Sequence, residues 1–167
     1  MCIRDRLCWD AEYLFGEILA GMKKCKEQGK LPENPVIVKT IVTTPLISAI
    51  CKEYGAEMAD LLTGFKYIGE QIKLFEQTGS NNYVFGLEES YGCLAGTHSR
   101  DKDACVAVMC LCEVAAYCKK EGKTLWDMML DMYEKYGYFK ESQYTITLKG
   151  IDGSKQIAAI MDKLRQN

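Results

Sequence analysis

The fold class of this chain is decided by the stretch VIVKTIVTTPLISAICKEYG, Val36–Gly55. Its first seven residues, VIVKTIV, are mostly β-branched and almost continuously apolar, which is typical of a strand covered on both faces. Thr44 can cap a following helix, Pro45 suits the first helical turn, and Gly55 suits the position after the last turn. The stretch therefore predicts a buried strand that leads directly into a helix.

Helices and strands alternate on both sides of this stretch. Helical patterns occur at 10–28, 63–77, 103–121 and 124–136, and strand patterns at 56–62 and 83–87. Such alternation is typical of an α/β domain with a largely parallel sheet. The apolar segment Ala104–Cys118 is too short to cross a bilayer and is interrupted by Glu113, so we expect it to be a buried helix.

The composition is that of an ordinary globular protein. The 167 residues carry a net charge of −2, which gives no indication of nucleic acid or an anionic membrane as a partner. No apolar signal-peptide core follows Met1–Arg6. Nine cysteines occur without a C-x-x-C pair, and His98 is the only histidine, so we predict no metal site and a reduced, cytoplasmic protein.

Polar, turn-forming residues follow three of the predicted strands. They are TTP at 43–45, TGFK at 63–66 and EESYG at 88–92. In a parallel sheet such segments gather along the carboxyl edge, where α/β folds bind their ligands. The sequence therefore predicts a binding site at this edge.

The EES triplet contributes a carboxylate and a hydroxyl to the predicted edge. The two-residue period of a strand places Glu88 and Ser90 on one side and Glu89 on the other, so the two glutamates do not converge as an acid/base pair. Glu88 and Ser90 can together hydrogen-bond the vicinal hydroxyls of a sugar. The alternative is that they cap the next turn, and the spacing favours neither interpretation.

Cationic residues lie close to two of these segments. Lys66 occupies the first turn of its predicted helix, where the helix dipole disfavours a cation unless an anion such as phosphate is bound; a solvated surface lysine is the alternative. Arg100 and Lys102 precede the next helix, whose N-cap is Asp101 or Asp103. Both cations are candidates for phosphate binding or proton transfer.

Signatures of several other enzyme classes are absent from the sequence. It contains no G-x-G-x-x-G after a strand, no G-x-x-x-x-G-K-[ST] and no G-x-S-x-G. Dinucleotide-binding, P-loop and α/β-hydrolase functions are therefore not indicated.

Four motifs, VKTIVTTPL, LTGFKYIGE, GLEESYG and GTHSRDKDA, occur in this order. Together they resemble the third domain of the α-D-phosphohexomutases, and they are most similar to the phosphoglucomutase and phosphomannomutase branch. The resemblance covers Ile18–Gly137 well and continues more weakly through the tail. It implies a three-layer α/β/α domain with a mainly parallel mixed sheet.

The resemblance also implies roles for individual residues. Glu88 and Ser90 would recognise the sugar by hydrogen-bonding its hydroxyls. Lys66 and Arg100 would also bind the substrate. Lys102 or Lys66 would be the general acid or base. Leu87 stands where the family often has glycine.

Members of this family are four-domain enzymes that move a phosphoryl group between sugar hydroxyls through a phosphoserine and a bisphosphorylated intermediate. For the complete enzyme the resemblance implies Mg²⁺, a glucose-1,6-bisphosphate-type activator, a hexose phosphate substrate, and domains I, II and IV as partners. The phosphoserine segment, the D-G-D-x-D-R metal loop and the fourth domain's phosphate clamp do not occur in this sequence. We therefore expect a fragment that is inactive alone. A stand-alone, non-catalytic sugar-phosphate-binding module is the alternative.

Three segments are expected along the chain. Residues 1–7 include MCIRDR, which fits no family pattern and is interpreted as a non-native leader, with a divergent natural start as the alternative. Residues 8–137 are the unit that resembles the third domain. Residues 138–167 predict one strand and one helix, which cannot bury a core alone and resemble the start of a truncated fourth domain.

Overall fold

The computed structural model describes residues 21–88, 92–139 and 147–166. Its four-stranded sheet has the order β2–β1–β3–β4 and consists of β1 (Pro35–Thr40), β2 (Glu57–Leu61), β3 (Asn82–Glu88) and β4 (Gly92–Ala95). The first three strands are parallel, and β4 runs antiparallel to β3. Residues 21–27 are helical, and the further helices are α2 (Leu46–Tyr54), α3 (Phe65–Thr78), α4 (Ala104–Lys120), α5 (Leu125–Tyr136) and α6 (Gly150–Arg165).

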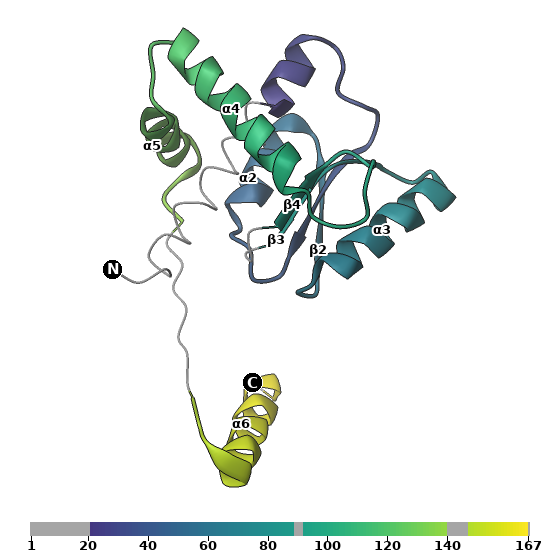
Figure 1. Ribbon diagram of the computed structural model, residues 1–167, viewed down its shortest axis with the longest axis vertical. Helices are drawn as coiled ribbons and strands as arrows, with labels where there is room; N and C mark the ends of the chain where they lie inside the picture. The colour runs from purple at the N-terminus through teal and green to yellow at the C-terminus, as the bar shows by residue number, and fades with distance from the viewer. Residues whose placement is uncertain (1–20, 89–91, 140–146, 167) are drawn as a thin grey trace.

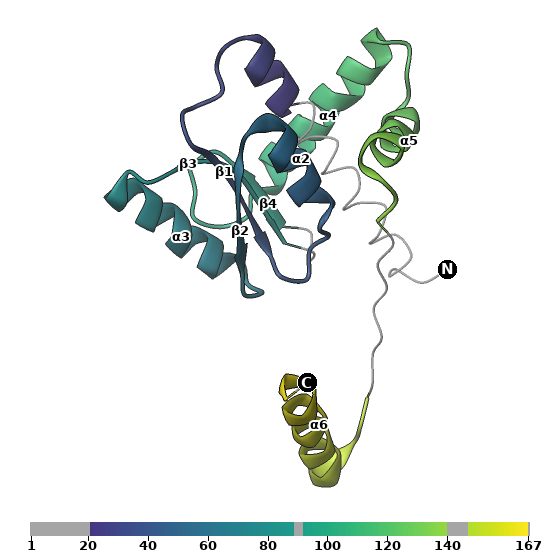
Figure 2. The same cartoon turned by 180° about the vertical axis from the view of Figure 1, so that it is seen from behind.

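The central strand, β1, is buried along its whole length. Val36 and Val38 pack against α3, whereas Ile37 packs against α2. Figures 1 and 2 show α2 and α3 on opposite faces of the sheet. The apolar run in the sequence thus correctly predicted a strand covered on both faces, although β1 ends at Thr40, two residues earlier than expected.

The predicted turn residues lie at the two ends of α2, with Pro45 instead of Thr44 at the N-cap position. Thr44 Oγ1 accepts a hydrogen bond from the Leu46 amide at 3.3 Å, and Pro45 at the start of the helix has φ −70°. Gly55 ends the helix with φ 68°, a left-handed conformation that glycine adopts without strain. This turn chemistry fixes where the chain leaves the carboxyl edge of the sheet.

β4 was not predicted from the sequence, in which residues 88–92 were expected to form a polar turn after the strand at 83–87. Gly92 pairs with Glu88, and Ala95 pairs with Phe85. Four residues beginning with glycine are too few to show a strand period, so only the pairing with β3 defines this element.

The expectation that Ala104–Cys118 forms a buried helix is wrong. The segment is helical, but within α4 only Val114 and Cys118 are buried. Val108 and Met109 are 62% and 56% exposed. Because α4 carries charge only at Glu113, Lys119 and Lys120, its sequence does not show which side of the helix lacks a neighbour.

The two ends of the chain are described in part. The helix expected at 10–28 is confirmed over residues 21–27, and its remainder lies outside the described residues, as does the segment 1–7. In the tail, residues 140–146 of the predicted strand are likewise outside, whereas α6 confirms the predicted helix. Figure 1 shows α6 standing apart from the sheet.

No helix among the described residues combines the length and the apolar character that a membrane crossing requires.

Replacing Gly69 by alanine should destabilise the fold. A Cβ at this α3 position would lie 2.5 Å from the backbone oxygen of Arg100, so the helix or the 96–103 loop must move. We expect a loss of about 1–3 kcal/mol in the free energy of unfolding, measured by urea denaturation.

Gly21→Ala is the matched control for this change. Gly21 is also helical but has nothing within 4 Å of an added Cβ. The control should be neutral or slightly stabilising, by up to about 1 kcal/mol. Equal effects of the two alanines would contradict a tight contact at Gly69.

Candidate functional site

The carboxyl ends of β1, β2 and β3 lie side by side. Thr40 of β1 pairs with Leu61 of β2, and Lys39 of β1 pairs with Leu87 of β3. The three polar segments that follow these strands therefore begin at one edge of the sheet, as the sequence predicted. This edge is the candidate site.

Glu88 and Lys102 form an ion pair at the edge. Glu88 is the last residue of β3, and its side chain is only 3% exposed. Lys102 Nζ donates a hydrogen bond to Glu88 Oε1 over 2.5 Å, while 42% of the lysine side chain remains exposed. A buried carboxylate is thus held by a lysine whose side chain is partly exposed to solvent.

Gly92 provides the space for this pair. A Cβ at Gly92 would lie 2.9 Å from Glu88 Cγ and 2.9 Å from Lys102 Cδ. Gly92 is also the residue opposite Glu88 in the antiparallel ladder. The pair therefore occupies the volume that any larger residue at the start of β4 would fill.

Lys39 is a polar residue of the edge that sequence reasoning did not single out. Its side chain is 5% exposed and is ion-paired with Asp60 of β2. Its Nζ also donates to the Thr43 carbonyl at 3.1 Å, in the turn between β1 and α2. The sequence does mark Lys39 as unusual, because it is the one charged residue in the apolar run VIVKTIV. Lys39 fixes this turn and holds a carboxylate at the end of β2.

Lys66 and Arg100 lie together in a different place, an open cleft along α3 that Tyr67, Gly69, Glu70 and Lys73 also line. Lys66 Nζ sits 4.9 Å from the centre of the Tyr67 ring. Arg100 Nη2 donates to Glu76 Oε2 at 2.6 Å. The structure thus groups the predicted site residues as two pairs, Glu88 with Lys102 and Lys66 with Arg100.

Asp103 is the N-cap of α4, which decides between the two aspartates that the sequence allowed. Its Oδ1 accepts from the amides of Cys105 and Val106 at 2.9 and 3.1 Å. His98 Nε2 lies 3.0 Å from Asp103 Oδ2. The contact with His98 is the main reason why the pKa of the Asp103 carboxyl lies below its usual value, and the amide hydrogen bonds lower it further. His98 therefore supports a helix cap.

Ser90 lies outside the described residues, so its predicted place beside Glu88 stays a prediction. Within the part of the chain that is described, no group of three or more His, Cys, Asp and Glu side chains could hold a metal ion.

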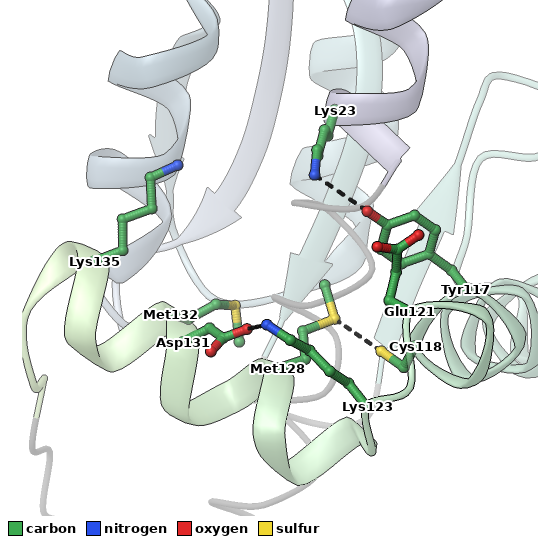
Figure 3. A pocket seen from close by; sticks show the side chains of 9 residues that line it. All are labelled: Lys23, Tyr117, Cys118, Glu121, Lys123, Met128, Asp131, Met132 and Lys135. Atoms are coloured by element: carbon green, nitrogen blue, oxygen red, sulfur yellow. Dashed lines mark hydrogen bonds and ion pairs between the residues drawn. The ribbon is translucent and has the colours of Figure 1, made fainter.

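A second cavity, of about 190 Å³, lies between residues 21–27, α4 and α5 (Figure 3). Cys118, Met128 and Met132 contribute apolar surface to it. Its lysines are all engaged, in the pairs Lys23–Tyr117, Lys123–Asp131 and Lys135–Glu53. The volume is below the roughly 300–1,000 Å³ of most small-molecule sites, so we attribute the cavity to imperfect helix packing.

A family comparison matches most of the chain. Residues 17–136 match the model for phosphoglucomutase/phosphomannomutase, alpha/beta/alpha domain III. The chain belongs to the phosphoglucomutase/phosphomannomutase family. The match includes the sheet edge and both pairs of site residues, Glu88 with Lys102 and Lys66 with Arg100.

Curated relatives of this phosphoglucomutase/phosphomannomutase domain support the same assignment. A phosphoglucomutase from Staphylococcus haemolyticus is 33% identical over 158 residues, which are 93% of this chain and 28% of that protein. One from Staphylococcus aureus is 35% identical over 132 residues, 79% of this chain and 24% of that protein. The chain thus spans about a quarter of the length of these relatives.

Solved structures agree on the fold. A phosphomannomutase from Thermus thermophilus, described as putative in its title, aligns with a TM-score of 0.55 at 21% identity, over 73% of this chain and 25% of the other. Parafusin from Paramecium, titled a phosphoglucomutase, aligns with a TM-score of 0.50 at 21% identity, over 61% of this chain and 17% of the other. At these identities the likeness concerns the α/β/α fold alone.

Lys102→Met should destabilise the protein more than loss of an exposed ion pair does. The change leaves the carboxylate of Glu88 buried without this cation, which we expect to cost about 1–3 kcal/mol in the free energy of unfolding. Urea denaturation at neutral pH measures the loss.

Lys123→Met is the control for this prediction. Lys123 and Asp131 form an ion pair in which both side chains are about half exposed, so its removal should cost about 0–1 kcal/mol. If both variants lose the same small amount, the Glu88–Lys102 pair does not stabilise the sheet edge.

Proposed function

We propose that this chain is the sugar-recognition domain of a phosphoglucomutase/phosphomannomutase-type enzyme, which transfers a phosphoryl group within hexose phosphates. The observation that carries the proposal is the Glu88–Lys102 pair at the carboxyl edge of the sheet. Edges of this kind bind the ligands of α/β folds. Membership of the family supports a hexose phosphate as the ligand.

The pair offers a donor and an acceptor to one ligand. The Glu88 carboxylate, together with the Ser90 hydroxyl two residues further along the chain, accepts hydrogen bonds from neighbouring sugar hydroxyls. The half-exposed Lys102 ammonium donates to a sugar or phosphate oxygen. A cation in this place also suits a general acid, for which Lys66 is the second candidate.

Lys66 and Arg100 supply positive charge from the neighbouring cleft. Lys66 stands in the first turn of α3, where bound phosphate offsets the unfavourable position of a cation. Arg100 is hydrogen-bonded to Glu76 with both side chains nearly half exposed, so its guanidinium can exchange Glu76 for a phosphate group at low cost.

The complete enzyme is proposed to use Mg²⁺ and a glucose-1,6-bisphosphate-type activator. The described residues of this chain contain no group of three or more His, Cys, Asp and Glu side chains that could hold a metal ion, and the sequence has no D-G-D-x-D-R loop. The role of the chain in the transfer is therefore to bind and orient the sugar, and to give or take a proton at Lys102 or Lys66.

Glucose 1-phosphate should bind to the chain, and alanine at Glu88 or Ser90 should weaken that binding. Each change removes hydrogen bonds to the sugar, and because bonds that involve a charged group contribute about 1.5–3 kcal/mol, Glu88→Ala should raise Kd at least about tenfold. Titration calorimetry measures both variants, and circular dichroism checks their folding.

Glu134→Ala is the control for this titration, because Glu134 is exposed on α5. Its Kd should equal that of the unaltered chain. If the unaltered chain does not bind, the polar loops merely cap helices and the proposed function fails. If it binds and neither alanine variant matters, only the assignment of the sugar-reading residues fails.

Purified residues 1–167 should not convert glucose 1-phosphate into glucose 6-phosphate when Mg²⁺ and glucose 1,6-bisphosphate are supplied. The sequence holds no phosphoserine segment that could donate a phosphoryl group. An assay coupled to glucose-6-phosphate dehydrogenase measures product formation. Any activity found should be unchanged in Lys102→Met, which identifies it as a contaminant; activity that disappears in this variant would contradict the prediction.

A further inference from the structure

The cleft along α3 is lined by two lysines that no carboxylate of the described residues neutralises. Lys66 and Lys73 lie two helical turns apart on one face of α3, with Glu70 between them. Of the ion pairs among the described residues, none involves any of these three side chains. Lys66 instead lies over the ring of Tyr67. Both ammonium groups can therefore accept an anion without breaking an ion pair.

The N-terminus of α3 adds further positive charge at the Lys66 end of the cleft. Gly64 is its N-cap and offers no side-chain oxygen to the amides of the first turn, which also contains no acidic residue. Uncapped amides and the helix dipole both attract anions. Lys66 and these amides thus favour a ligand of the same charge.

Arg100 is the third cation of the cleft, and its hydrogen bonds go to two places. Nη1 donates to the carbonyl oxygens of Thr97 and Ser99 at 2.9 and 3.3 Å, within the guanidinium's own loop. Nη2 donates to Glu76 Oε2 at 2.6 Å. Glu76 is not part of the cleft lining and lies three residues beyond Lys73 on α3. A phosphate that binds the guanidinium through two hydrogen bonds needs Nη2, the atom that Glu76 occupies.

We propose that Glu76 is an internal competitor, which phosphate must displace from Arg100 before the cleft can bind it fully. Lys66 and Lys73 hold the same phosphate group. The inference rests on the proposed function, in which this cleft takes the phosphate of a hexose phosphate. It adds the third cation, Lys73, and a residue that sets how tightly the cleft binds.

Competition of this kind has a quantitative signature. When only a fraction of the molecules has its binding group available, the apparent affinity falls by that fraction. Arg100 and Glu76 are 46% and 44% exposed, and exposed ion pairs are weak enough for the competition to cost about a two- to sixfold loss of affinity. The factor should be the same for every anion that needs Arg100, and it should be absent for a neutral sugar.

Glu76→Gln should tighten the binding of phosphate. Its Kd for inorganic phosphate should fall about two- to sixfold, and its Kd for glucose 1-phosphate should fall by the same factor. The Kd for glucose, which has no charge, should stay as it is. Nuclear magnetic resonance titrations at constant ionic strength measure the three ligands, and circular dichroism verifies the fold. A variant that binds phosphate no more tightly than the unaltered chain overturns the proposal.

Glu70→Gln is the matched control. It removes the same charge from the same face of α3, and Glu70 lines the cleft itself but is not paired with Arg100. It should therefore tighten phosphate binding less than Glu76→Gln does. If the cleft responded only to nearby charge, Glu70→Gln would have the same or the larger effect, and that result would contradict competition.

An Arg100→Gln background tests whether the effect passes through the guanidinium. In this background Glu76→Gln should no longer tighten phosphate binding, whereas any effect of Glu70→Gln should remain. A Glu76→Gln effect of unchanged size overturns the proposal. The comparison of the two single variants requires no change at Arg100, so it decides the matter even where Arg100→Gln fails to fold.

The two phosphate ligands separate this inference from the proposed function. If inorganic phosphate binds and responds to Glu76→Gln while glucose 1-phosphate binds no more tightly than phosphate, the competition holds and sugar recognition fails. If inorganic phosphate binds neither the unaltered chain nor Glu76→Gln, the competition is overturned. The effect of Glu88→Ala on glucose 1-phosphate then still tests the proposed function.

Discussion

The buried carboxylate of Glu88 is the constraint around which the sheet edge is built. Leaving a buried carboxylate without its cation costs about 1–3 kcal/mol, so a cation at the end of β3 stabilises the edge. Lys102 supplies it at 2.5 Å, and Gly92 leaves the volume in which the two side chains meet. The amide of Asp103 bonds to the Cys93 carbonyl of β4 at 2.9 Å, which ties the lysine-bearing segment to the sheet.

Because Lys102 is held at Glu88, the two cations Arg100 and Lys102 lie on two different surfaces of the molecule. The backbone of Arg100 is seated on α3 at Gly69, and its guanidinium reaches Glu76. Two residues later the chain has returned to the edge, where Lys102 meets Glu88. Neighbours in sequence therefore face separate regions of the molecule. A phosphate that contacts both cations would have to release Arg100 from Glu76, which is inexpensive at a half-exposed pair.

The sequence allowed the elements to be predicted where a local pattern determines them. β1 and α2 are marked by an apolar run and by turn residues at Thr44, Pro45 and Gly55, each of which acts within a few residues of itself. β4 and the partners of Lys39 depend on which strands pair, and no local pattern encodes that. For the site, the prediction that Glu88 and Glu89 point to opposite sides of the strand stays a prediction, because residues 89–91 lie outside the described residues. The contact between Lys102 and Glu88 depends on the path that the chain takes after β4, which no local sequence pattern shows.

The wrong expectation for α4 has the same origin. An apolar helix sequence predicts that the helix needs packing partners, but it does not show whether the helix's own domain provides them. Val108 and Met109 of α4 are therefore 62% and 56% exposed in a segment whose composition indicates a buried helix.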